Sequence, residues 1–189
     1  MRILITGDSF AADWQKKYPG QIGWPNLLSD LHAVTNLAQA GCSEYRIYKQ
    51  IISSNLDQFD FIIVSHTSPY RIYTEYHPNR VDDVLHRYCD LLYSDIEELA
   101  KINPEYLSAV EYFKKFFSLE YADFCHKLIL DKINALLKNR QAIHLSHIVQ
   151  TANSINFSDL YKTHRGLINH YNDEGNQIIY KKIIEELSK

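Results

Sequence analysis

The chain has 189 residues, of which 46% are hydrophobic, and a formal net charge of -3. This length suits one domain, residues 1–189, that buries its own core without a cofactor or disulfide. Acidic and basic residues are scattered along the whole sequence, which argues against nucleic acid as a partner. The three cysteines, Cys42, Cys89 and Cys125, lack the close spacing of a metal or redox motif and suit a reducing compartment.

We predict neither a targeting signal nor a membrane span from the sequence. The opening run, Met1-Arg2-Ile3-Leu4-Ile5-Thr6-Gly7, is too short for a signal peptide, and no later run approaches a membrane span. We therefore expect a cytoplasmic protein with no membrane partner. Composition favours no particular oligomeric state.

The first third of the chain alternates strand and helix patterns. Residues 2–6 are a β-branched and leucine run ended by Gly7, which predicts a buried parallel strand at the centre of a sheet. Apolar spacing predicts a helix over residues 24–31, a strand over 33–37, a helix from 43 or 44 to 52, and a strand over 59–65. Such alternation predicts a parallel sheet with helices on both faces.

The remainder is dominated by helical periodicity. Residues 81–139 have a helical period, broken near Asn103 and Pro104, and are longer than a crossover requires. We expect a helical insertion at about 81–140 that caps the site or binds a partner. A strand over residues 142–148, a short strand near Ile155 and a last helix over 172–187 complete the prediction. The apolar positions assigned to one face of the insertion are Val84, Leu91, Leu92, Ile96 and Leu99.

Two polar segments carry candidate chemistry. Gly7-Asp8-Ser9 follows the first strand, so Ser9 is expected at the carboxyl edge of the sheet, where ligands of open parallel sheets bind. A helix start nearby supplies positive potential to an oxyanion. His170 precedes the last helix, and an imidazole brought near a serine can accept its proton.

This combination resembles the SGNH (GDSL-like) hydrolase family over nearly the whole chain, the central helical region excepted. The matching pieces are a strand ending in Gly-Asp-Ser, a glycine loop after the second strand, and a histidine followed by x-Asn-x-x-Gly. In this sequence they are residues 3–9, the loop 36–41 with Ser43, and His170 with Asn172 and Gly175.

The resemblance implies an α/β fold, a flavodoxin-like three-layer α/β/α sandwich with a central parallel sheet, and ester hydrolysis or acyl transfer through an acyl-serine. It implies that Ser9 is the nucleophile and His170 the general base. It also implies an oxyanion hole made by the Ser9 and Gly41 amides and a third donor at the position of Thr67.

The sequence departs from the family pattern at two positions. Thr67 stands where the family has an asparagine, so Thr67, His66 or Arg71 replaces that donor, or activity is low. Leu167 stands where the family places an aspartate. The orienting partner of His170 is then a backbone carbonyl, giving a Ser-His dyad, or a carboxylate from elsewhere. Asp13 and Asp159 are the candidates for that carboxylate.

Other residues near the strand ends are candidates for binding rather than catalysis. Residues 65–77 are dense in polar groups just past a buried strand, and Asp8, His66 and Arg71 are the predicted substrate-binding residues. The sequence lacks the glycine motifs of dinucleotide, P-loop and α/β-hydrolase sites. His144 and His147 lie three apart around a strand, which does not suit a metal site, so we expect no metal and no cofactor.

The leading hypothesis is a serine esterase acting on acyl esters, O-acetyl groups of carbohydrates or other small molecules in particular, the substrate by family analogy alone. Three alternatives stay open. The first is an acyltransferase using Ser9 and His170. The second is a non-catalytic protein that binds a glycan or partner on an SGNH frame, with Thr67 and Leu167 marking a degraded site. The third is an α/β domain whose Gly-Asp-Ser is an ordinary turn.

Overall fold

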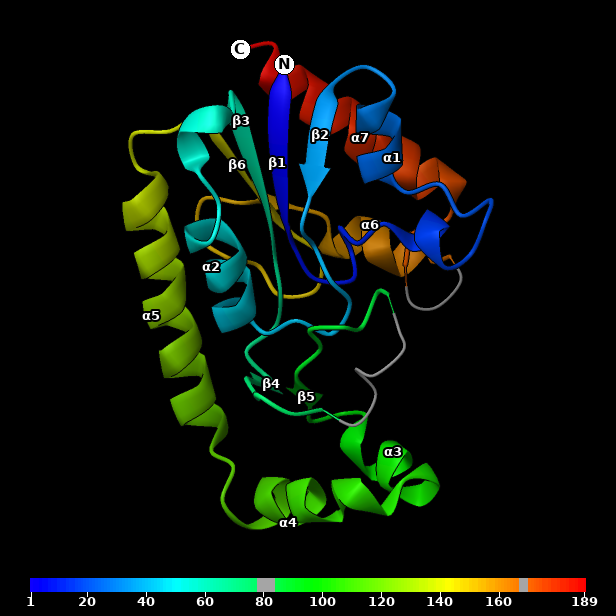
Figure 1. Cartoon of the computed structure of the whole chain (residues 1–189), viewed down its shortest axis with the longest axis vertical. Helices are drawn as coiled ribbons and strands as arrows, with labels where there is room; N and C mark the ends of the chain where they lie inside the picture. Colours follow the sequence, from blue (N-terminus) through cyan, green and yellow to red (C-terminus); the bar gives the residue numbers. More distant parts are fainter. Residues whose placement is uncertain (78–83, 167–169) are drawn as a thin grey trace.

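The computed structural model describes residues 1–77, 84–166 and 170–189 (Figure 1). Residues 81–83 of the predicted insertion, and Leu167, lie outside these ranges. A five-stranded sheet runs through the molecule in the order β2-β1-β3-β6-β7, and all its strand pairs are parallel. β1 is therefore internal, while β3 takes the middle position expected for the first strand. The strands are β1 (Arg2–Gly7), β2 (Ala33–Asn36), β3 (Phe61–His66), β6 (Ala142–Ser146) and β7 (Ile155–Asn156).

Helices cover both faces of the sheet, which confirms the three-layer α/β/α sandwich. On one face lie α1 (Trp24–Ser29), α6 (Ser158–Thr163) and α7 (Asp173–Leu187), and on the other α2 (Glu44–Ile52) and α5 (Leu119–Leu137) (Figure 1). Alternate residues of a strand point to opposite faces. Accordingly Ile3 and Ile5 pack in the α1 and α7 layer, whereas Leu4 packs in the α2 and α5 layer.

The predicted insertion has two different parts. α5 belongs to the sandwich, because its buried Ile133 and Leu137 pack against the sheet beside α2. No helix of the described residues, α5 with its 19 residues included, has the length and apolar character required to cross a bilayer.

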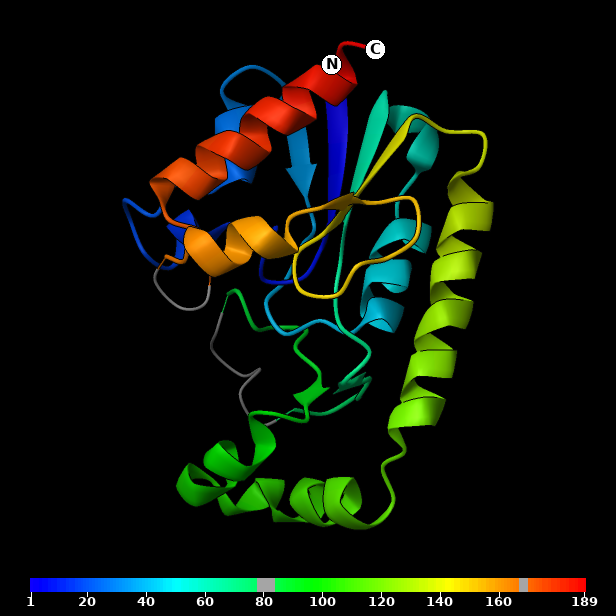
Figure 2. The same ribbon diagram turned by 180° about the vertical axis from the view of Figure 1, so that it is seen from behind.

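The rest of the insertion lies beyond the carboxyl ends of the strands (Figures 1 and 2). It holds α3 (Ile96–Ile102) and α4 (Leu107–Lys115), joined by a short 3-10 helix (Pro104–Tyr106) and packed around a small core of their own. The helical prediction is wrong for residues 84–95, Val84 included, because they form turns and the strand β5 (Leu91–Leu92). β5 pairs antiparallel with β4 (Arg71–Ile72). Two further 3-10 helices span Trp14–Lys16 and Leu56–Gln58.

Candidate active site

The turn after β1 presents Ser9 at the carboxyl edge of the sheet. Gly7 ends the strand where a Cβ atom would lie 2.7 Å from the Cβ atom of Ser65, so only glycine allows β1 and β3 to approach this closely. The carboxylate of Asp8 then accepts a hydrogen bond from the Phe10 N–H at 3.0 Å. This contact closes the turn and leaves Ser9 half-buried at its outer edge.

His170 reaches the same place from the other end of the chain. It lies two residues before Asn172, the N-cap of α7. Its ring contacts the rings of Trp14 and Phe10, with centroid separations of 4.3 and 5.5 Å. Trp14 in turn donates from Nε1 to the Ser9 carbonyl oxygen at 2.7 Å. Phe10 and Trp14, which both follow Ser9 in the chain, therefore hold the imidazole of His170 at the serine turn.

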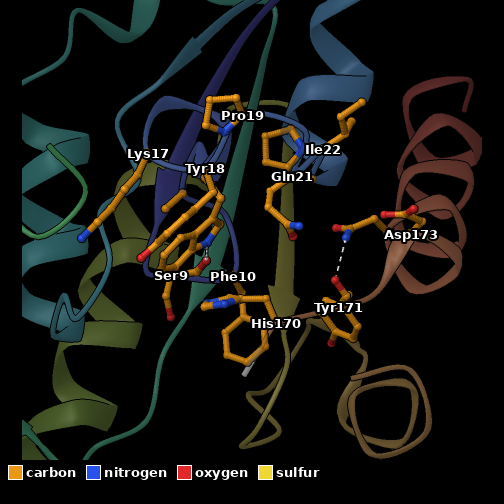
Figure 3. A pocket seen from close by; sticks show the side chains of 15 residues that line it. Ser9, Phe10, Lys17, Tyr18, Pro19, Gln21, Ile22, His170, Tyr171 and Asp173 are labelled. Carbon is orange, nitrogen blue, oxygen red and sulfur yellow. Dashed lines mark hydrogen bonds between the residues drawn. The ribbon is translucent and has the colours of Figure 1, made fainter. Parts of the chain in front are cut away.

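Two cavities meet at this point. One has a volume of about 360 Å³ and lies between residues 14–25 and the start of α7, where Figure 3 shows Ser9 and His170 on its wall. The other, of about 550 Å³, extends toward Gly41 and the β4 and β5 segments. The residues common to the two linings are Ser9, Phe10, Trp14 and His170. A substrate whose reacting bond lies at Ser9 would therefore have space for one of its two parts in each cavity.

The backbone amides of Ser9 and Gly41, two residues that line the larger cavity, are the predicted oxyanion donors. Within residues 1–77, 84–166 and 170–189, neither the Ser9 N–H nor the Gly41 N–H donates a hydrogen bond to a protein group. Gly41 has a φ of +75°, and an added Cβ atom would lie 2.8 Å from the Cβ atom of Cys89. This left-handed conformation, which glycine adopts readily, sets the direction of the Gly41 amide.

The third predicted donor does not fit this geometry. Thr67 is buried and lines neither cavity, and its hydroxyl donates to Asp8 Oδ2 at 2.9 Å. Arg71 pairs with the same carboxylate oxygen at 3.2 Å and donates to the Cys42 carbonyl oxygen at 2.7 Å. Burial raises the pKa of Asp8, and Arg71 opposes that change. Asp8 and Thr67 therefore stabilise the turn through buried hydrogen bonds, whereas Arg71 lines the larger cavity.

His66 was predicted to bind substrate, but it is buried away from both cavities. Its Nδ1 lies 2.7 Å from Glu44 Oε1 and its Nε2 lies 2.9 Å from His144 Nδ1. Although burial acts to raise the pKa of Glu44, His66 and His126 lower it to about 2. Burial and His66 lower the pKa of His144 to about 4. In the described residues, no cluster of three or more His, Cys, Asp and Glu side chains could hold a metal ion.

A second serine and histidine pair, which sequence reasoning missed, lies beneath the first. His147 Nε2 lies 3.1 Å from Ser65 Oγ, and its Nδ1 lies 3.0 Å from the Tyr171 hydroxyl. The ring of His147 stacks on Phe10 with centroids 4.6 Å apart. Burial, followed by the nearby charge of His170, lowers the pKa of His147 to about 3. This pair is fully enclosed, so it stabilises the core. The sequence signal for it was weak: both residues lie near the ends of predicted strands, over 59–65 and 142–148.

The carboxylates proposed to orient His170 are engaged elsewhere. Asp13 Oδ1 accepts from Asn26 Nδ2 at 2.8 Å. Asp159 is exposed and pairs with Lys162 at 2.8 Å. Leu167, at the position where the family has its aspartate, lies outside the described residues.

Fold and site together define a class: a three-layer α/β protein that presents a serine and a histidine at the carboxyl edge of its parallel sheet. No family model matches the sequence, and no curated protein matches it as a relative. Among solved structures, the chain is similar to the esterase EstA from Pseudoalteromonas sp., with 12% identity, coverage of 99% of this chain and 96% of that one, and a TM-score of 0.49. It is similar to the acetyl xylan esterase AlAXEase, and to a protein assigned to the lipolytic G-D-S-L family from Desulfitobacterium hafniense. Each of these two has 13% identity, 98% coverage of both chains and a TM-score of 0.41. The function proposed below therefore rests on the residues of this chain.

Proposed function

We propose that the protein is a serine hydrolase of the SGNH type that cleaves carboxylic esters through an acyl intermediate on Ser9. The observation that supports this most directly is that Ser9 and His170, 161 positions apart in the sequence numbering, line the same two cavities. Ser9 and Gly41 both line the larger cavity, and their amides, which donate to no protein group among the described residues, are the proposed donors for a developing oxyanion.

In the proposed reaction, Ser9 Oγ bonds to the ester carbonyl carbon while its proton passes to the imidazole of His170. The carbonyl oxygen becomes an oxyanion and accepts hydrogen bonds from the Ser9 and Gly41 amides. The bond to the alcohol oxygen then breaks, and His170 returns the proton to the departing alcohol. Water attacks the acyl-Ser9 by the same route, so one ester and one water give one acid and one alcohol.

The rate is expected to be modest for this class. With the Thr67 hydroxyl engaged by Asp8, two amides remain for the oxyanion. The loss of one such donor typically costs about a hundredfold to a thousandfold in rate.

The test is labelling of the purified chain with a fluorophosphonate, followed by peptide mass spectrometry. We expect an adduct on Ser9 that is absent in Ser9→Ala and strongly reduced in His170→Ala. The matched control is Ser65→Ala, which removes the buried serine hydroxyl that contacts His147. Because Ser65 is fully buried, this variant is expected to label on Ser9 as the wild type does. An adduct on Ser65, or no adduct where a known esterase is labelled, would contradict the proposal.

Acyl transfer is a second candidate, favoured by the size of the larger cavity. A volume of about 550 Å³ beside Ser9 gives an acceptor alcohol, such as a sugar hydroxyl, room to replace water in the second step. Product analysis with a nucleophilic alcohol present separates the two: a new ester indicates transfer, and free acid alone indicates hydrolysis.

A further inference from the structure

Trp14 contacts both residues of the proposed reaction. It opens the 3-10 helix Trp14–Lys16, five positions after Ser9, and its indole N–H donates to the Ser9 carbonyl oxygen at 2.7 Å. The centroids of its ring and of the His170 ring are 4.3 Å apart, with the ring planes inclined by 46°. Trp14 also lines both cavities that meet at the serine. One side chain is therefore bonded to the backbone of the nucleophile and packed against the general base.

The indole ring of Trp14 is itself held on several sides. It packs against a small buried apolar cluster formed by Ala12, Ala40 and Leu85. Tyr18 stacks on it with ring centroids 6.1 Å apart and planes inclined by 22°. The Tyr18 N–H donates to the Trp14 carbonyl oxygen at 2.9 Å, which fixes the backbone of this turn. Because the indole has little conformational freedom left to lose, it can hold a neighbouring ring at a small cost in entropy.

The imidazole of His170 changes charge during the proposed reaction. It becomes an imidazolium when it takes the proton of Ser9 Oγ, and in Ser-His-Asp sites a buried aspartate orients the ring and stabilises that charge. Leu167 stands at the position of the aspartate here, and a leucine side chain has neither a charge nor a hydrogen-bond acceptor. An aromatic ring attracts a cation within about 6 Å of its centroid, most strongly when the ring is that of tryptophan. The contact between Trp14 and His170 lies inside that distance.

This attraction depends on the protonation state of His170. A neutral imidazole carries no net charge, so the contact with Trp14 strengthens as the proton moves from Ser9 to His170. An interaction that is stronger in the transition state than in the ground state accelerates the chemical step. Phe10 contacts His170 too, but its centroid lies farther away, at 5.5 Å, and its ring is stacked on His147. Trp14 is therefore the better placed of the two rings.

We propose that Trp14 is a positioning residue of the site: its indole ring orients the imidazole of His170 and stabilises the positive charge that this imidazole acquires. This inference rests on the proposed function, and it assigns to an aromatic ring the task that a carboxylate performs in a Ser-His-Asp site. As Ser9 Oγ bonds to the carbonyl carbon, its proton passes to His170, and the imidazolium forms against the indole. When the alcohol leaves, it takes that proton, and the charge beside Trp14 is lost.

Two substitutions at Trp14 separate the ring from its N–H. Trp14→Phe and Trp14→Leu both remove the donor to the Ser9 carbonyl oxygen, but only Trp14→Phe keeps an aromatic ring beside His170. The assay is fluorophosphonate labelling, in which Ser9 Oγ bonds to phosphorus, fluoride leaves and the proton passes to His170. We expect Trp14→Leu to label about tenfold more slowly than Trp14→Phe, since the energy of a ring–cation contact corresponds to roughly that factor. Urea unfolding of both variants checks that they are folded under the conditions of the assay.

The dependence on probe concentration distinguishes positioning from binding. Because Trp14 lines both cavities, a role in binding alone would raise KI, the probe concentration that gives half of the limiting rate. We expect the two variants to differ instead in kinact, the limiting rate at saturating probe, with the same KI.

A double-mutant cycle tests whether the effect passes through the imidazole. It compares the labelling rates of the wild type, Trp14→Leu, His170→Ala and the double variant. If the indole acts through His170, the double variant labels as slowly as His170→Ala and no more slowly. A merely structural role of Trp14 would slow labelling in both backgrounds.

The outcomes separate this inference from the proposed function. A faster rate in Trp14→Phe than in Trp14→Leu, expressed in kinact and absent without His170, supports the role of the ring. Equal rates in the two variants, a difference in KI alone, or an effect of Trp14→Leu that persists without His170 overturns that role and leaves the esterase in place. Absence of a Ser9 adduct in the wild type, where a known esterase is labelled, overturns the proposed function itself.

Discussion

At the scale of single residues, the site depends on one backbone conformation. Gly41 adopts φ +75° and lies against Cys89 so closely that a Cβ atom has no space. Its amide is one of the two donors assigned to the oxyanion. The backbone conformation of Gly41 therefore affects both the rate of the proposed reaction and the stability of the fold.

We predict that Gly41→Ala slows fluorophosphonate labelling of Ser9 about a hundredfold, because the backbone must shift away from Cys89 and take the amide with it. Gly20→Ala is the control. Gly20 also has a positive φ, +95°, but nothing lies within 4 Å of an added Cβ atom. Both variants carry a strain of roughly 1–2 kcal/mol, measurable by denaturant unfolding. Equal labelling rates in the two would show that the Gly41 amide is not used.

At the scale of elements, α7 holds the histidine in place. Asn172 caps this helix by accepting the Gly175 N–H at 2.9 Å, and His170 lies two residues before the cap. Helix caps of this kind stabilise a protein by about 1 kcal/mol. The same bond therefore connects helix stability to the position of His170.

We predict that Asn172→Ala lowers the free energy of unfolding by about 1 kcal/mol and slows labelling of Ser9 roughly tenfold, since a small displacement of a catalytic group is costly. Ser118→Ala removes a comparable cap, the bond from the Tyr121 N–H at the start of α5. It is expected to lose similar stability with unchanged labelling. If both variants label at the wild-type rate, α7 does not position His170.

At the scale of the whole molecule, polar groups buried on both faces of the sheet make folding sensitive to acid. His144 and His147 are neutral in the folded protein because burial lowers their pKa values to about 4 and about 3. In the unfolded chain they take up protons near pH 6.5. Below that pH the unfolded state holds more protons, so stability falls as pH falls.

We predict a loss of about 1.4 kcal/mol per histidine for each pH unit between about 6.5 and 4. Glu44, with a pKa lowered to about 2, adds to the loss below its ordinary value of 4.5. Asp8, whose pKa burial raises, acts in the opposite sense. Urea unfolding at pH 7, 6 and 5 measures the effect. His144→Gln is expected to show about half the slope of the wild type, and a wild-type stability that stays level over this range would contradict the prediction.

The order of elements could be read from the sequence because local chemistry specifies it. Apolar runs predicted the strands β1 and β3, and glycines marked the ends of two strands, Gly7 after β1 and Gly41 after β2. The motif Gly-Asp-Ser and the histidine before α7 were likewise local patterns. They predicted Ser9, Gly41 and His170 as the candidate site, and these three residues line a common cavity.

Only the tertiary structure decided which polar side chains face that cavity and which face the core. His66 ends β3 and Thr67 follows it, much as Ser9 follows β1, yet both lie buried and bonded to other elements. The bond between Ser65 and His147 joins residues 82 positions apart, and no local pattern encodes such a partner. A buried polar group needs a hydrogen-bond partner, and the packing on the two faces of the sheet decides which partner lies within reach. That packing is a property of the whole chain, and it determines the role of each residue at the strand ends.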